Sequence, residues 1–72
     1  MDAFLNKILT AEQADKVSKI FDAEMIDMEC LTGYRDYGPP LDYKRCEQDL
    51  IHIGIDCPIV RQKIMDAVGI KK

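Results

Sequence analysis

Two groups of helix-breaking residues, Gly38-Pro39-Pro40 and the segment from Gly54 to Pro58, restrict this chain of 72 residues to short elements. Proline lacks the amide hydrogen that a helix interior needs, and it disfavours the helical conformation in the residue before it. Gly54 is suited to the left-handed conformation that ends a helix, whereas Pro58 is tolerated in a first helical turn. The second group therefore predicts a turn between two helices, with Asp56 as N-cap of the later one.

Apolar residues recur at helical spacing before the first break, and no segment of the chain alternates apolar and polar residues as a strand does. This spacing predicts a first helix from about residue 2 to 9. Thr10 to Gln13 has the form of a capping box, in which two side chains satisfy amides at a helix end. Residues 2–25 therefore form either one bent helix or two.

The middle of the chain predicts a short helix followed by a loop. Asp27 is a suitable N-cap for a helix of one to two turns, and Gly33 is a suitable end for it. Because Gly38-Pro39-Pro40 is not helical, we expect an extended ordered loop around residues 33–45. This loop contains three tyrosines, Tyr34, Tyr37 and Tyr43. They either pack on the core, which we favour, or form a binding surface or phosphorylation sites.

Two further helices are expected over residues 46–53 and about 57–68, the second being a long C-terminal helix. The fold class that follows is all-α, a compact bundle of five helices in one domain spanning residues 1–72, which can be a module of a larger protein. A chain of this length buries only about 60% of its unfolded surface, so little room remains for an enclosed catalytic pocket.

Composition excludes several classes of function. A net charge of −3 and a pI near 4.9 argue against a nucleic-acid binder, which usually presents a basic surface. No stretch approaches the ~20 apolar residues of a membrane span, so we expect no membrane insertion. The three cysteines, Cys30, Cys46 and Cys57, form no close pair, which favours reduced thiols in an intracellular, cytoplasmic protein over a disulfide framework.

Charge is unevenly distributed along the chain. Acidic residues dominate from Ala23 to Asp49, whereas the bases beyond Val60 outnumber the single acid there, Asp66. The acidic middle and the basic end either meet head to tail between copies or form two solvated faces. The bases of the end segment are Arg61, Lys63, Lys71 and Lys72.

His52 and Cys57 lie five residues apart and raise the question of a catalytic pair or a metal site. A cysteine at a helix N-terminus does have its thiolate favoured by the helix dipole. A nucleophile also needs an oriented base and an oxyanion site, and structural zinc needs four ligands, usually in close pairs. The sequence shows no third residue at a recognisable spacing that would complete a catalytic site, and no closely paired zinc ligands. We therefore expect no catalysis, no metal and no cofactor.

Residues 47–68, EQDLIHIGIDCPIVRQKIMDAV, resemble the second half of a sterile alpha motif (SAM) domain. That family reads approximately E-D-L-x-x-L-G-I, then four or five residues, then R-x-K-I-L-x-A-I. The segment IFDAEMIDMECL, residues 20–31, resembles the junction of the family's first two helices. The positions in register with the longer motif are Asp49, Leu50, Ile53, Gly54, Ile55, Arg61, Lys63, Ile64 and Ala67.

The resemblance implies a non-catalytic protein–protein interaction module whose partner is another SAM domain, in the same or a different protein. It implies an end-helix interface at Ile59, Arg61, Gln62 and Lys63, and a mid-loop interface at Asp36, Asp42, Glu47 and Asp49. Ile59 either faces solvent as an apolar anchor, which we favour slightly, or packs inward. One alternative function is a monomeric domain that docks on one unrelated partner, with contacts through the three tyrosines. The other, RNA-hairpin binding, needs a basic surface that residues 56–59 do not supply.

Overall fold

The computed structural model describes residues 2–70, and within that range the chain is helical with no strand, as the sequence predicts. Expectations for Met1, Lys71 and Lys72, including the last two bases of the end segment, lie outside the described residues. The elements are α1 (Asp2–Ile8), α2 (Ala11–Ala23), α3 (Met28–Gly33), the 3₁₀ helix η1 (Tyr34–Tyr37), α4 (Leu41–His52) and α5 (Pro58–Ala67).

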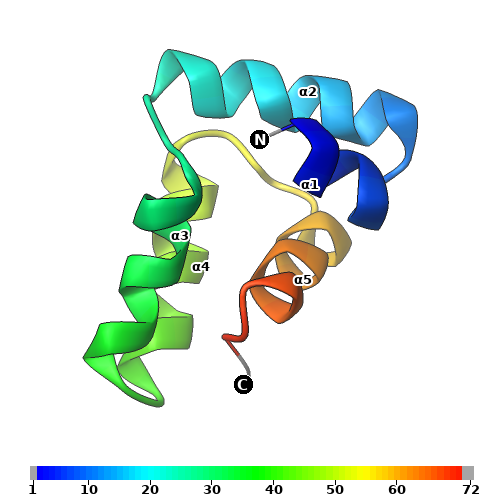
Figure 1. Cartoon of the computed structure of the whole chain (residues 1–72). Coiled ribbons are helices and arrows are strands. Elements are labelled where there is room, and N and C mark those ends of the chain that lie inside the picture. Colours follow the sequence, from blue (N-terminus) through cyan, green and yellow to red (C-terminus); the bar gives the residue numbers. More distant parts are fainter. Residues whose placement is uncertain (1, 71–72) are drawn as a thin grey trace.

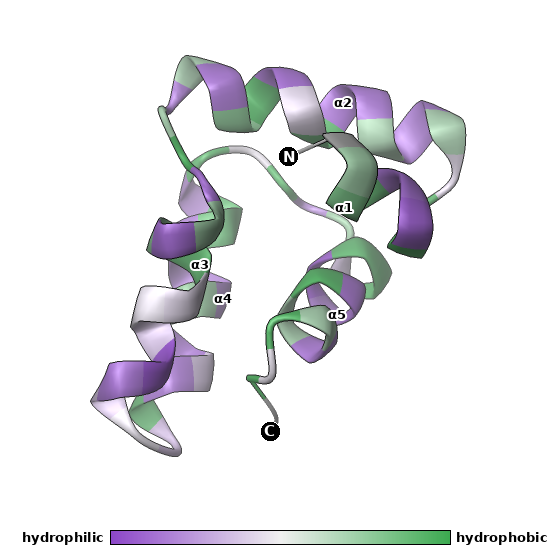
Figure 2. Cartoon of the chain, viewed as in Figure 1, coloured by the Kyte–Doolittle hydropathy of each residue, from purple (hydrophilic) through white to green (hydrophobic). Residues whose placement is uncertain are grey.

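The helices enclose one small apolar core. Helix α2 runs across the upper end of the molecule in Figure 1, α3 and α4 lie below one end of it, and α1 and α5 lie below the other. Figure 2 shows hydrophobic residues concentrated along α5, while the outer side of α2 is mainly hydrophilic. The largest fully buried side chains come from every α-helix and from the C-terminal turn: Leu5, Phe21, Leu31, Cys46, Leu50, Ile64, Met65 and Ile70.

Residues 2–25 form two helices, which answers the question that the sequence leaves open. The Gln13 backbone amide donates to the Thr10 hydroxyl oxygen at 3.2 Å, and the Thr10 amide donates to the Gln13 side-chain oxygen at 3.2 Å. These two bonds are the predicted capping box. The chain turns at Thr10, so α1 packs back against α2.

The start of α3 agrees with the prediction and its end does not. Asp27 caps the helix by accepting a bond from the Cys30 amide at 2.9 Å, and this bond lowers the pKa of Asp27. Gly33 is right-handed, with φ −60° and ψ −27°, so the chain continues directly into η1. Gly38, with φ 75°, is the residue at which η1 ends. Its conformation is the left-handed one that a side chain disfavours.

The extended loop expected around residues 33–45 is wrong, because most of that segment is helical. The 3₁₀ helix η1 occupies its first part, and α4 begins at Leu41. Pro40 is the N-cap of α4, where the amide hydrogen that proline lacks has no helical partner to lose. From there, buried residues follow at helical spacing: Tyr43, Cys46 and Leu50.

The break between α4 and α5 also differs in part from expectation. Gly54 has φ 108°, and the Ile55 amide donates to the Leu50 carbonyl at 2.9 Å, which closes α4 in the predicted way. The N-cap of α5 is Cys57, without a side-chain cap bond, and not Asp56. Helix α5 has 10 residues, fewer than the 13 of α2 and the 12 of α4, so the C-terminal helix is not the long one. We call residues 53–57 the α4–α5 connection.

Among residues 2–70, no helix has the length and the apolar character that crossing a membrane requires.

Candidate functional site

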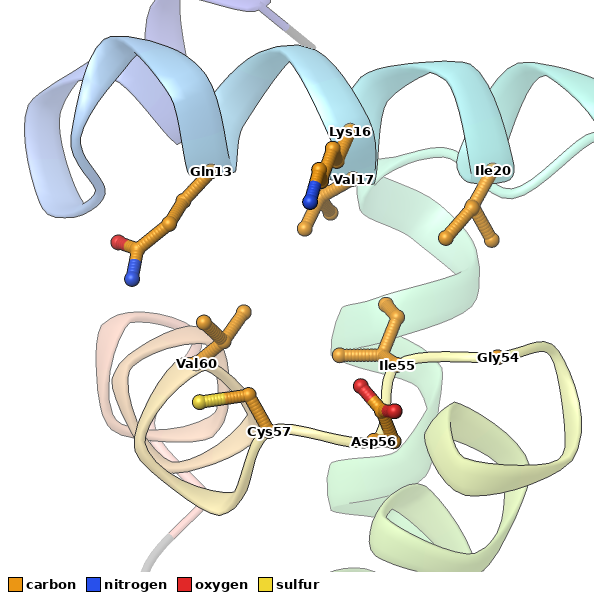
Figure 3. Close-up of a pocket in the computed structure, with 9 residues that line it drawn as sticks. All are labelled: Gln13, Lys16, Val17, Ile20, Gly54, Ile55, Asp56, Cys57 and Val60. Carbon is orange, nitrogen blue, oxygen red and sulfur yellow. The ribbon is translucent and has the colours of Figure 1, made fainter.

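An open groove of about 260 Å³ lies between α2 and the α4–α5 connection (Figure 3). Helix α2 contributes Gln13, Lys16, Val17 and Ile20. The opposite side consists of Gly54, Ile55, Asp56, Cys57 and Val60. A groove of this size accommodates one or two side chains of a partner, whereas ligand pockets typically span ~300–1,000 Å³.

The walls of the groove are apolar and its rim is charged. Val17, Ile55 and Val60 are core residues, so the groove is an exposed continuation of the core. Figure 3 shows Lys16 and Asp56 extending toward the groove from opposite sides. Because the two charges have opposite sign, the groove suits an apolar group that carries an acid on one side and a base on the other.

Ile59 lies on the first turn of α5, next in the chain to Val60 of the groove, and its side chain is 62% exposed. Val60 is buried. The orientation that the sequence slightly favours is therefore the observed one. An isolated exposed aliphatic residue is ordinary. Ile59 does not line the groove, but it lies on the turn of α5 that contributes Val60 to it, which makes Ile59 a candidate contact residue.

Arg61 lies inside the molecule and not on the end-helix surface. Its side chain is only 9% exposed, and its Nη1 donates to the Ile55 carbonyl at 2.7 Å. Its Nε is buried without a hydrogen-bond partner. The guanidinium therefore holds the α4–α5 connection against α5, and Lys63 is the exposed cation among the predicted end-helix residues.

Gln62 likewise takes part in bonds within the chain. It is half-buried, accepts a bond from the Tyr43 hydroxyl at 2.9 Å and donates to the Asp66 carboxylate at 2.9 Å. This chain of bonds joins the first turn of α4 to α5. Gln62 thus positions α5 against α4.

The four predicted mid-loop carboxylates are not all exposed on one surface. Asp42 is buried and accepts a bond from the Tyr43 amide at 2.7 Å, while Asp49 accepts a bond from the Tyr34 hydroxyl. Glu47 is half-buried, and Asp36 is exposed on η1. Asp36 is therefore the mid-loop carboxylate most available to a partner.

Two of the three tyrosines pack on the core, and the third does not. Burial raises the pKa of Tyr34, and the neighbouring Asp49 carboxylate raises it further. Burial also raises the pKa of Tyr43, with a contribution from Glu47. Tyr37 is 52% exposed and carries the Arg45 guanidinium over its ring, 4.8 Å from the centroid.

His52 and Cys57 differ in exposure and in the element that carries them. His52 is exposed at the last residue of α4, and Cys57 is half-buried in the groove. Residues 2–70 contain no group of three or more His, Cys, Asp or Glu side chains arranged to hold a metal ion. Cys46 is fully buried, and burial, with nearby carboxylates, raises its pKa to about 12.

The contribution of α2 to the groove is what sequence reasoning missed. The apolar stripe of α2 places Val17 and Ile20 on an inner face, but periodicity does not reveal that this face meets the α4–α5 connection.

In comparisons with known proteins, no family model, curated protein or solved structure matches the chain.

Proposed function

We propose that this chain is a non-catalytic, SAM-like module that associates with other proteins through the start of α5 and the groove beside it. The partner is another domain of the same kind, in the same or a different protein, and association scaffolds the larger protein that carries the domain. The three cysteines, all free, support an intracellular, cytoplasmic setting.

The observation that carries the proposal is the exposure of Ile59 on the turn of α5 that contributes Val60 to the groove. A side chain that is 62% exposed, on the turn of α5 that also contributes Val60 to the groove, offers a partner a protruding contact on the same turn as a recessed one. Interfaces draw most of their binding energy from a few such apolar anchors. The motif residues of the SAM resemblance place the family's end-helix contact at the same turn.

The test is sedimentation over a wide concentration range, comparing the wild type with Ile59→Asp and with a matched control, Met25→Asp. Met25 is 86% exposed in the turn after α2, does not line the groove, and has φ 56°, a conformation that Asp tolerates. Loss of an interface anchor costs about 2 kcal/mol, which weakens association about 30-fold. We expect that loss for Ile59→Asp and wild-type behaviour for Met25→Asp.

Equal association of the wild type and Ile59→Asp contradicts the assignment of this surface. A wild type that stays monomeric at every concentration excludes self-association and leaves binding to a different partner. In that case the same two variants are compared for binding to an identified partner domain. A partner bound equally by both variants refutes the proposed surface.

A further inference from the structure

We propose that the solvent-facing side of α4 is a docking surface for an acidic amphipathic helix of another protein. This surface lies outside the groove and outside the first turn of α5, so the inference goes beyond the proposed function and does not depend on it. We call the surface the α4 stripe and define it by six exposed residues: Leu41, Lys44, Arg45, Gln48, Ile51 and His52.

The α4 stripe has the residue spacing of a helix–helix contact. Four of its residues follow one another at intervals of three, four and three: Leu41, Lys44, Gln48 and Ile51. Side chains at these intervals lie along one side of a helix and meet a partner helix over its length. The first and last of the four are aliphatic, and each is 49% exposed. The stripe therefore offers a partner helix two apolar anchors near opposite ends of α4, which is about 18 Å long.

The charges of the α4 stripe have one sign. Lys44 and Arg45 are cations, and His52 adds a third basic group at the last residue of the helix. Within residues 2–70, none of these three side chains forms a salt bridge with a carboxylate. The chain as a whole has a net charge of −3, so this concentration of bases is local, and it favours an acidic partner. The carboxylates of α4 are buried, half-buried or bonded within the chain: Asp42, Glu47 and Asp49.

One of the cations is already held in place on the surface. The Arg45 guanidinium lies over the ring of Tyr37, 4.8 Å from its centroid, and this contact leaves the guanidinium without a carboxylate partner. A side chain that is held before binding loses less rotamer freedom when a partner docks. Arg45 is therefore a preorganised site for an acid of the partner helix.

The order of residues along the stripe favours a helix over a membrane surface as the partner. A helix that lies in the surface of a bilayer needs a continuous apolar face, with its bases on the opposite, polar face. On the α4 stripe, Lys44 and Gln48 lie between the two aliphatic residues, so inserting the aliphatic side chains into a bilayer also buries the polar ones. A helix–helix contact accommodates polar residues between its apolar anchors, where they fix the register of the two helices.

The complementary partner follows from these features. It is a helix with two aliphatic side chains spaced like Leu41 and Ile51, and with acidic side chains beside them. The contact between two short helices is small, and small contacts are typical of weak, transient association.

The probe for this surface is a synthetic peptide of about three heptads with Leu at positions a and d, Glu at e and g, and Ala elsewhere. Repulsion between the glutamates keeps the free peptide from pairing with itself. Fluorescence anisotropy of the labelled peptide measures binding to the protein. We expect the wild type to bind this glutamate peptide and to bind it more weakly as the salt concentration rises. A scrambled peptide of the same composition and a peptide with Lys in place of every Glu are expected not to bind.

Two variants test the residues of the stripe. Ile51→Gln removes one apolar anchor and is expected to weaken binding of the glutamate peptide about tenfold. Lys44→Glu is expected to weaken it several-fold and to gain binding of the lysine peptide, a reversal of preference that lower stability does not produce. The acid it introduces is the fourth residue of α4, near the end of the helix where the helix dipole favours an acid.

Two matched controls change similar side chains outside the stripe. Met28→Gln replaces an exposed apolar residue of α3. Lys19→Glu reverses the charge of an exposed lysine of α2, which pairs with Asp15 at 3.1 Å. We expect both controls to bind the glutamate peptide like the wild type.

Three outcomes overturn the inference. The first is a wild type that does not bind the glutamate peptide, or a peptide that the wild type, Ile51→Gln and Lys44→Glu bind equally. The second is binding that Ile59→Asp weakens and Ile51→Gln does not, because the peptide then lies at the start of α5. The third is cosedimentation with phosphatidylserine vesicles that Lys44→Glu abolishes, without binding of the peptide, which identifies a membrane surface as the partner.

Discussion

Replacement of Arg61 distinguishes a structural role from an interface role for this residue. The SAM resemblance places Arg61 on the end-helix surface, but the structure places its guanidinium inside, 2.7 Å from the Ile55 carbonyl. Arg61→Met retains an apolar side chain of similar length and removes only the charged head. We expect this variant to be less stable than the wild type and to keep its association once it is folded.

The magnitude follows from the contacts of the side chain. A hydrogen bond from a charged donor contributes about 1.5–3 kcal/mol, and its loss leaves the Ile55 carbonyl without that partner. Removing the buried, unpaired Nε of Arg61 recovers about 1 kcal/mol of this loss. The net expectation for Arg61→Met is a destabilisation of about 0.5–2 kcal/mol. Arg61→Ala also removes two buried methylene groups, which adds about 1.6 kcal/mol.

Urea unfolding followed by circular dichroism measures these differences as a shift in midpoint at constant slope. The control is Lys63→Met, on the exposed side of α5, which is expected to change the free energy of unfolding by less than about 0.5 kcal/mol. An Arg61→Met protein as stable as the wild type refutes the argument, because the connection then does not depend on the guanidinium. Weaker association at unchanged stability assigns Arg61 to the interface instead.

Two further predictions concern the thiols and the first capping box. Under native alkylation followed by peptide mass mapping, exposed Cys30 reacts first and half-buried Cys57 second, whereas Cys46, buried and with its pKa raised to about 12, reacts only after unfolding. Native modification of Cys46 as rapid as that of Cys30 contradicts the packing of α4. Thr10→Ala removes the N-cap bond of α2 and lowers stability by about 1 kcal/mol, or roughly 4–8 °C in Tm, while Thr10→Ser leaves it unchanged. A Tm for Thr10→Ala equal to that of the wild type argues against the cap.

The sequence predicted the ends of helices correctly where a residue type has a single strong conformational preference. Gly54 ends α4 in the left-handed region, and the Thr10 capping box separates α1 from α2. Asp27 caps α3 for the same kind of reason, since a carboxylate satisfies an otherwise unpaired amide. These features depend on neighbours within a few residues, which a sequence displays directly.

The same reasoning failed where a local signal has two interpretations. Gly38-Pro39-Pro40 indicates a break, but a proline at a helix start and a proline in a long loop give the same pattern. Charges between Leu41 and Cys46 concealed the first turns of α4, although Tyr43 and Cys46 already have helical spacing. The burial of Arg61 depends on a carbonyl six residues away in a turn, and no periodicity predicts that contact.

Consecutive residues at the start of α5 lie either in the core or on the surface. Only some substitutions there can therefore change association without also changing stability. Ile59 faces solvent, Val60 lines the groove as part of the core, and Arg61 is bonded to the connection. A change at Val60 or Arg61 therefore alters stability as well as any contact made in the groove. Asp56 and Ile59 are exposed, so their replacement changes the contact surface with little loss of packing. If replacing Asp56 or Ile59 weakens association and leaves the free energy of unfolding unchanged, the start of α5 is a docking surface. If every replacement that weakens association also lowers the free energy of unfolding, the start of α5 serves the fold.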